Sequence, residues 1–246
     1  MSLPAGNPRP DEEIERVLVV VAHPDDVDFG ASGSIAGWTQ AGIEVSYCLV
    51  TDGQAGGFEP ERDRAEMPAV RRAEQTTAAE HVGVRDLHFL GYSDGELEPS
   101  LGLVRDIVRV IRKVRPQRLV TSSPERNWAR MPASHPDHLA AGEATTRAFF
   151  PAAGNPYAFT DLLEDEGLEA WTVGELWLQA HHENNHYVDI TDHFDAKVKA
   201  ILSHVSQHPD PSQLPERIRA WNAQNAAAAG FPEGRLAEGF AVIRLG

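Results

Sequence analysis

The sequence is poor in cysteine: Cys48 is the only one, so no intrachain disulfide can form. It lies in the apolar segment 45–50, where a buried strand thiol is expected rather than a nucleophile. Long apolar runs are missing as well. No stretch approaches the roughly 20 residues that a membrane-spanning helix needs, and residues 1–11 lack the apolar core of a signal peptide. These absences predict a cytoplasmic protein with no membrane span.

Basic residues are outnumbered by acidic ones. The chain of 246 residues has 22 Lys and Arg against 37 Asp and Glu, which gives a formal net charge of −15. Nucleic acids and anionic membranes are bound by clustered Lys and Arg. The one arginine-rich segment, 105–118, has Val and Ile between its arginines at helical spacing. Its arginines are therefore expected to form a solvated helix face. We therefore expect no nucleic acid or anionic membrane among its partners.

The alternation of apolar and polar segments predicts an α/β fold. Four apolar, often β-branched segments are expected to be strands, at about 16–22, 44–50, 86–90 and 118–122. Helices are expected after them, at about 30–41, 68–81, 101–114 and 134–150. This order favours right-handed βαβ units and therefore a Rossmann-like, doubly wound, mainly parallel sheet with helices on both faces.

The rest of the chain predicts a C-terminal elaboration of the same domain. Further strands are expected at about 172–180, 187–190 and 240–245, with a helix at about 195–206. No linker is long enough to separate two domains. We therefore expect a flexible N-terminal arm over residues 1–14 and a single domain over residues 15–246.

Polar side chains gather where the first strand is expected to end. The segment Ala22-His23-Pro24-Asp25-Asp26 directly follows the apolar run 17–21, and a buried parallel strand would place it at the carboxyl edge of the sheet. A histidine and two adjacent carboxylates are costly to hold together there without a cation. The segment therefore predicts a metal site that needs at least one more ligand.

A second segment of the same kind follows the fourth expected strand. His135-Pro136-Asp137-His138 comes after that strand and a loop, and Ser134 with Asp137 has the spacing of a helix-opening capping box. Strands one and four are commonly neighbours in a doubly wound sheet, with the ligand crevice between them. We therefore expect the two segments to converge although they lie far apart in the sequence.

These residue types suit a catalytic metal. Two histidines and one aspartate leave an open fourth position for water on Zn²⁺, and the same set suits Fe²⁺. Asp25 and Asp26 are adjacent, so one can bind the metal while the other is a general base beside the water. His135 and His138 lie on one side of a helix's first turn, so one can bind metal while the other faces the substrate. Asp137 is available to orient an imidazole.

Together, Ala22-His-Pro-Asp-Asp26 and His135-Pro-Asp-His138 resemble the LmbE-like, PIG-L family of zinc-dependent de-N-acetylases. That family includes N-acetylglucosaminyl-phosphatidylinositol deacetylases and the deacetylases and amidases of the mycothiol and bacillithiol pathways. Less specific matches lie at 51–56, 71–74, 91–94 and 204–207. The resemblance implies a hydrolase that uses zinc-activated water to remove the N-acetyl group from an N-acetylglucosamine-type sugar or glycoconjugate, a small-molecule partner.

The resemblance also implies a role for each functional residue. The zinc ligands would be His23, Asp26 and His138. Asp25 would be the general base, and His135, oriented by Asp137, would stabilise the oxyanion or protonate the leaving amine. Arg71 and Asp94 match positions that contact the substrate in related sugar deacetylases, although a helix–loop salt bridge and a turn-stabilising carboxylate explain them equally well.

The chain departs from the family pattern in two places. Val27 and Asp28 follow the first motif where the family often has Glu, which affects the support of the loop rather than the ligands. Ala133 stands where some sugar-active members have a tyrosine two residues before the second motif. Tyr92 and Tyr157 are the candidates to replace that tyrosine.

Other interpretations stay open. An amidase for a thiol-sugar conjugate would keep the metal and cleave a larger amide, whereas a non-catalytic carbohydrate-binding protein would not need Asp25 as a base. The segment 181–186, rich in histidine, is expected to be a polar loop beside the cleft rather than a metal site, and 30–33 does not match a dinucleotide-binding motif. Loops 53–67, 124–134 and 151–170 are expected to select the substrate. A homo-oligomer is compatible with the sequence.

Overall fold

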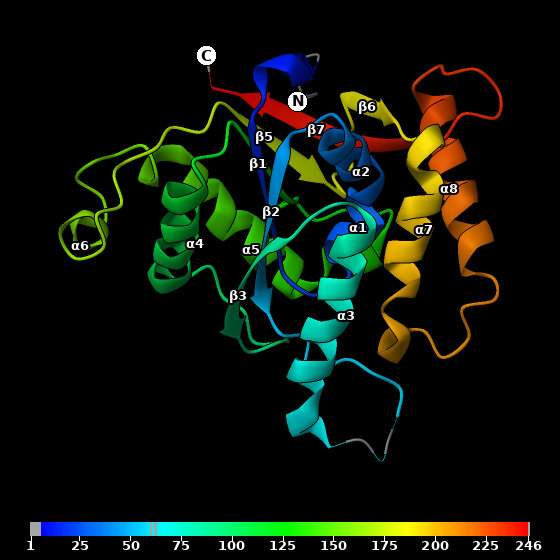
Figure 1. The fold of residues 1–246 in the computed structure, drawn as a ribbon, viewed down its shortest axis with the longest axis horizontal. Helices are drawn as coiled ribbons and strands as arrows, with labels where there is room; N and C mark the ends of the chain where they lie inside the picture. Colours follow the sequence, from blue (N-terminus) through cyan, green and yellow to red (C-terminus); the bar gives the residue numbers. More distant parts are fainter. Residues whose placement is uncertain (1–5, 60, 62, 246) are drawn as a thin grey trace.

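A seven-stranded sheet runs through the described part of the chain, which comprises residues 6–59, 61 and 63–245 of the computed structural model. Its strand order is β3-β2-β1-β4-β5-β7-β6 (Figure 1). The strands are β1 Arg16–Val21, β2 Glu44–Thr51, β3 Asp86–Tyr92, β4 Arg118–Ser122, β5 Glu175–Gln179, β6 His186–Asp189 and β7 Ala237–Arg244. Strands β1 to β5 pair in parallel, whereas β7 pairs antiparallel with β5 and β6.

Eight α-helices accompany the sheet within the described residues. They are α1 Asp26–Gly30, α2 Ser32–Gln40, α3 Met67–His81, α4 Leu101–Val114, α5 Pro136–Arg147, α6 Thr160–Glu164, α7 Phe194–Leu202 and α8 Leu214–Ala228. Helix α4 forms where the sequence predicts it because its ends are well defined. The Ser100 hydroxyl caps its start by accepting a hydrogen bond from the Leu103 N–H at 3.2 Å, and Arg115 ends it in the left-handed conformation.

Helices cover both faces of the sheet (Figure 1). On one face, α4 and α5 pack against β1, where Ile107 shares a core with Leu18. On the other face, α2, α3 and α7 share a second core in which Ile35 lies with Val19. Residues 17–21 of β1 are fully buried because alternate side chains enter opposite cores. The single doubly wound α/β domain predicted from the sequence is confirmed.

Two local expectations are wrong. Residues 23–29, between the strand expected at 16–22 and the helix expected at 30–41, do not form a continuous connecting loop, because α1 begins at Asp26. Ser134 does not cap α5; instead the His135 ring is the cap, and its Nδ1 accepts a hydrogen bond from the Asp137 N–H at 3.2 Å. The helix cap is therefore His135 rather than Ser134, and the capping hydrogen bond holds the imidazole ring of His135 in place.

The segment that precedes β1 contacts the sheet. Asp11 pairs with Arg118 of β4 at 2.8 Å, the Arg9 N–H donates to Glu175 of β5 at 2.8 Å, and Ile14 is buried. Residues 1–5 of the expected flexible arm lie outside the described residues. The domain boundary after residue 14 stays a prediction.

Cys48 is buried in β2, and burial raises the pKa of its thiol, in keeping with the structural role expected for it. Among the helices of the described residues, none combines the length and the apolarity needed to cross a membrane.

Candidate metal centre and active-site cleft

The two polar motifs meet at the carboxyl ends of β1 and β4. These strands are neighbours, and β2 lies beyond β1 while β5 lies beyond β4, so the chain winds outward from them in opposite directions. Open α/β sheets bind their ligands at such a switch point. His23 to Asp26 follow β1 directly, whereas the second motif returns through a loop to open α5. The sheet thus brings together segments that are distant in sequence.

Three side chains converge with the separations of a tetrahedral metal site. His23 Nδ1 lies 3.2 Å from His138 Nε2. The Asp26 carboxylate lies 3.4 Å from His23 Nδ1 through its Oδ2 and 2.9 Å from His138 Nε2 through its Oδ1. Ligand atoms bound at about 2.0–2.2 Å around a tetrahedral ion are about 3.3–3.6 Å apart. This donor set therefore fits a zinc-type ion and leaves a fourth position open.

The other nitrogen of His23 faces two carboxylates. Its Nε2 lies 3.0 Å from Asp94 Oδ1 and 3.2 Å from Asp137 Oδ2, and Asp137 is buried and accepts the Gly95 N–H at 2.7 Å. Burial lowers the pKa of His23, yet the carboxylates around it, Asp26 foremost, raise this pKa to about 12. The site therefore stabilises positive charge on His23 Nδ1, where a metal ion would replace the proton, and its two outer carboxylates fix the ring.

His135 is held by the backbone rather than by a carboxylate. The Asp137 N–H donates to His135 Nδ1 at 3.2 Å, whereas the Asp137 carboxylate contacts His23. A neutral His135 must therefore carry its proton on Nε2. Burial, followed by the nearby His23 and His138, lowers the pKa of His135. The ring is thus a neutral hydrogen-bond donor in the lining of the cleft.

Asp25 is turned away from its neighbour Asp26. Its φ of 93° is left-handed, and the carboxylate contacts Arg71 Nη2 at 3.1 Å while the backbone N–H donates to Gln75 Oε1 at 2.8 Å. Burial raises the pKa of Asp25 to about 6 against the opposing effect of Arg71. A carboxylate with a pKa near the working pH, beside a metal centre, has the properties of a general base.

Arg71 is buried and clamps the loops around the site. Besides Asp25, its guanidinium donates to the carbonyl oxygens of Pro24 and Gly53. Gly53 has a φ of 61°, and a Cβ there would lie 2.8 Å from Arg71 Nη1, so only glycine lets the loop after β2 approach this closely. The ion pair with Asp25 is the helix–loop salt bridge that the sequence offered as one explanation of Arg71. Arg71 also lines an open cleft beside the site, as the second explanation, substrate contact, requires.

A buried network supports the first motif from behind. The Asp28 carboxylate lies 2.8 Å from His204 Nε2 and accepts the Gln75 side-chain N–H at 3.0 Å. Lys197 Nζ donates to the Asp28 carbonyl oxygen at 2.9 Å and to Glu238 at 2.6 Å. Sequence reasoning missed this network, although His204 lies in the less specific family match at 204–207. The available signal was a lysine at a position of α7 whose helical neighbours are apolar.

Other candidates raised by the sequence lie away from the metal centre. His181 Nε2 and His182 Nδ1 lie 3.5 Å and 3.6 Å from Glu125 Oε2, a separate cluster at the ends of β4 and β5. Tyr92 donates its hydroxyl hydrogen to a carboxylate of α4 at 2.8 Å, and Tyr157 is 87% exposed. Neither tyrosine lines the two cavities that border the metal centre within the described residues.

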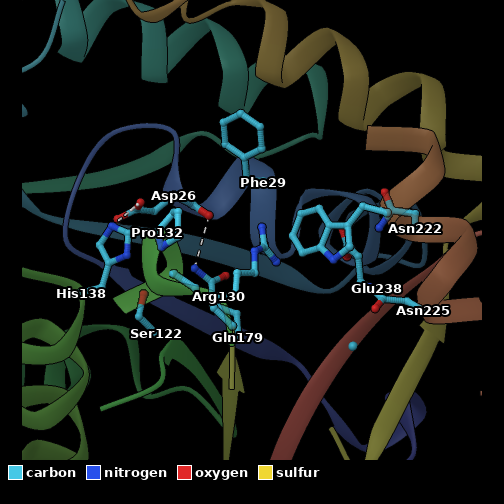
Figure 2. Close-up of a pocket in the computed structure, with 15 residues that line it drawn as sticks. Asp26, Phe29, Ser122, Arg130, Pro132, His138, Gln179, Asn222, Asn225 and Glu238 are labelled. Carbon is cyan, nitrogen blue, oxygen red and sulfur yellow. Dashed lines mark hydrogen bonds and ion pairs between the residues drawn. The ribbon is translucent and has the colours of Figure 1, made fainter. Parts of the chain in front are cut away.

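Two cavities share the metal centre as a common wall. An open cleft of about 360 Å³ is lined by the acid–base residues and their neighbours, among them Asp25, Arg71, Asp94 and His135. A second cavity of about 180 Å³ extends from the centre toward α8 (Figure 2). Asp26, Pro132 and His138 border both. The two cavities therefore share two of the candidate metal ligands as a common border.

Proteins with similar sequences and structures cover most of this chain. Residues 18–149 match a family model described as PIG-L: GlcNAc-PI de-N-acetylase. A diacetylchitobiose deacetylase of Thermococcus kodakarensis is 33% identical over 201 residues, which cover 82% of this chain and 73% of that protein. A probable N-acetyl-alpha-D-glucosaminyl L-malate deacetylase 2 of Bacillus subtilis is 34% identical over 225 residues, which cover 89% and 95%. The structure of N,N'-diacetylchitobiose deacetylase from Pyrococcus horikoshii has a TM-score of 0.86 at 30% identity, covering 96% of this chain and 86% of that one.

Proposed function

Because the chain belongs to the PIG-L family of GlcNAc-PI de-N-acetylases, we propose that it hydrolyses the N-acetyl group of an N-acetylglucosamine-type sugar or glycoconjugate. The observation that carries this proposal is the division of two adjacent carboxylates. Asp26 lies among the ligand atoms, whereas Asp25 faces the open cleft with a raised pKa. A site that only binds sugar has no need of such a base beside a metal ligand.

The ion would be held by His23, Asp26 and His138. Two imidazoles and one carboxylate suit Zn²⁺, and Fe²⁺ is the alternative for the same donors. When bound, the ion lowers the pKa of a bound water to about 7 and polarises the amide carbonyl. Asp94 and Asp137 would keep His23 in place by accepting the proton on its Nε2.

The acid–base residues of the cleft then carry the proton transfers, and Arg71 holds one of them in place. Asp25 accepts a proton from the attacking water, whose oxygen bonds to the amide carbon. His135 donates its Nε2 hydrogen to the oxyanion that develops there, since its Nδ1 is occupied by the Asp137 N–H. Asp25 then passes the proton to the nitrogen as the carbon–nitrogen bond breaks, and acetate and the amine leave. Arg71 positions Asp25, and both Arg71 and Asp94 line the cleft that the sugar would enter.

A second candidate is an amidase acting on a thiol-sugar conjugate. It would use the same residues on a substrate with a larger acyl group. The observation in its favour is the second cavity beyond Asp26 and His138, which an acetyl group would leave largely unused. In either case the partner is a small molecule, and a cytoplasmic location stays a prediction.

The proposed function is tested by acetate release. We expect the metal-loaded protein to release acetate from N-acetylglucosamine or diacetylchitobiose, and Asp25→Asn to lower kcat by about 10²–10⁴-fold while metal content stays unchanged. Asp86→Asn is the matched control, because this exposed carboxylate pairs with His88 at the far end of β3. Activity of Asp25→Asn equal to that of the unchanged protein would refute the mechanism. No acetate from any N-acetylated sugar would refute the proposed function.

A further inference from the structure

The second cavity begins at the metal ligands but contains none of the acid–base residues. Asp26 and His138 form its inner end, and Asn222 and Asn225 of α8 lie at the other end (Figure 2). In the mechanism above, the amine part of the substrate lies in the open cleft, because Asp25 delivers a proton to the leaving nitrogen. The acyl part must then point away from the cleft. The second cavity is the space that it would enter.

This cavity is larger than an acetyl group requires. Its volume is about 180 Å³. On the same measure, a cavity of about 10–15 Å³ is large enough for one water molecule. An acetyl group extends beyond the reacting carbon by a single methyl. The space therefore suits an acyl chain of several atoms.

The outer part of the cavity holds a cation without a counter-charge. The Arg130 guanidinium lies 4.2 Å from the centre of the Trp221 ring, and no carboxylate of the described residues pairs with it. Arg130 stays exposed to solvent at the outer end of the cavity, and its partial desolvation there lowers its pKa, with no acidic group to oppose this effect. Glu238, which also borders the cavity, is neutralised by Lys197 at 2.6 Å. An arginine in this position is suited to a carboxylate on a ligand.

The wall between the two ends is polar and fixed. The Gln179 side-chain N–H donates to the Asp26 carbonyl oxygen at 3.3 Å, and that of Asn222 donates to the Ala237 carbonyl oxygen at 2.9 Å. Both residues are at least 95% buried, and their side-chain oxygens have no hydrogen-bond partner among the described residues. Both oxygens are acceptors and would pair only with a hydrogen-bond donor on a ligand, so within this cavity Arg130 is the group suited to a carboxylate.

We propose that the second cavity is an acyl subsite, and that it accepts N-acyl amino sugars whose acyl chain ends in a carboxylate facing Arg130. This inference rests on the proposed function, because it assigns the amine part of the substrate to the open cleft. The reaction needs no co-reactant besides water. The water oxygen bonds to the acyl carbon, the carbon–nitrogen bond breaks, and the nitrogen takes up a proton. The products are a dicarboxylate and the amino sugar.

The test compares three acyl groups on glucosamine: acetyl, succinyl and succinamoyl, the neutral amide of the same chain. The readout is kcat/KM for release of glucosamine by the metal-loaded protein. We expect the succinyl substrate to be cleaved at least about tenfold better than the succinamoyl substrate, and Arg130→Gln to remove most of this ratio. Arg130→Lys, which keeps the charge, should retain part of it. Arg126→Gln is the control and should retain all of it, because its guanidinium lies over the exposed Trp128 outside the cavity.

The outcomes separate this inference from the proposed function. A succinyl to succinamoyl ratio near one, or a ratio that Arg130→Gln leaves unchanged, would overturn the acyl subsite while acetate release still supports the proposed function. A loss in Arg130→Gln that affects diacetylchitobiose more than N-acetylglucosamine would place the sugar in this cavity and also overturn the inference. Cleavage of the succinyl substrate without acetate release would support the subsite and refute N-acetyl hydrolysis as the proposed function.

Discussion

Asp25 and Asp26 are neighbours in the chain, and the backbone torsion φ of Asp25 turns their carboxylates toward different parts of the site. The φ of 93° at Asp25 lies in the left-handed region, which costs an ordinary residue about 1–2 kcal/mol and is tolerated best by Gly, Asn and Asp. The turn is held by hydrogen bonds, since the Asp25 carbonyl accepts the N–H groups of Asp28 and Phe29 at 2.9 Å and 3.2 Å. Strain of this kind is characteristic of functional sites, where the surrounding structure holds it in place.

This strain predicts an order of stability among variants at one position. Asp25→Gly should have a free energy of unfolding about 1–2 kcal/mol higher than Asp25→Ala, because both lose the contact with Arg71 but only alanine bears the cost of a positive φ. Urea unfolding of both variants in the presence of a chelator measures the difference. The same pair at Asp86, an ordinary strand residue, should show the opposite order. Equal stability of Asp25→Gly and Asp25→Ala would contradict a left-handed Asp25.

The elements that the sequence predicts well are those whose signals are local. Helix α4 and strand β1 match their expected positions closely, because helical spacing with a serine cap and a β-branched run lie within the segments themselves. Helix α1 was not predicted, because its start at Asp26 depends on the turn at Asp25 and on hydrogen bonds to Asp28 from α3 and α7. The convergence of the two motifs was predictable from strand order. The partner of the Asp137 carboxylate was not, because it depends on the orientation of one side chain in the first turn of α5.

The ion pair between Asp28 of α1 and His204, which follows α7, predicts that the stability of the domain depends on pH. Burial lowers the pKa of His204, but the Asp28 carboxylate at 2.8 Å more than compensates, so this pKa is raised above 6.5. Stability from a raised histidine pKa is fully present below the unfolded value of about 6.5 and is lost as the pH rises through the folded value. His204→Leu should therefore cost about 3–5 kcal/mol at pH 6 and clearly less at pH 9.

Urea unfolding of the metal-saturated protein at the two pH values measures this difference. The control is His88→Leu, because His88 forms a comparable pair with Asp86 at 3.2 Å on the surface. That variant should change the free energy of unfolding by about 0–1 kcal/mol at either pH. A cost of His204→Leu that is the same at pH 6 and pH 9 would contradict a charged His204–Asp28 pair.

At the scale of the whole molecule, the sheet topology determines where the candidate catalytic residues lie, and the loops determine the shape of the cavities around them. The candidate metal ligands come from the end of β1 and the start of α5, whereas the cavities are completed by loops that the sequence singled out for substrate selection. Loop 124–134 contributes Arg130, Pro132 and Ala133 to the second cavity, and loop 53–67 contributes Ala55 and Gly56 to the open cleft. The insertion 151–170 lines neither cavity within the described residues. The shape of these loops did not follow from the sequence, because they carry no periodic pattern.

An ion at the switch point would join the end of β1 to the start of α5, so its removal should lower the stability of the whole domain. An ion that binds only the folded state contributes about 2.7 kcal/mol at a concentration of 100 Kd. For a chain of 246 residues this corresponds to a Tm about 5–10 °C higher with Zn²⁺ than with a chelator. The difference should shrink toward pH 5, because the ligands must lose protons to bind the ion. In thermal melts His138→Ala should abolish the difference, whereas Glu125→Ala, in the separate cluster with His181 and His182, should keep it. A Tm that does not respond to metal would contradict the ligand set on which the proposed chemistry depends.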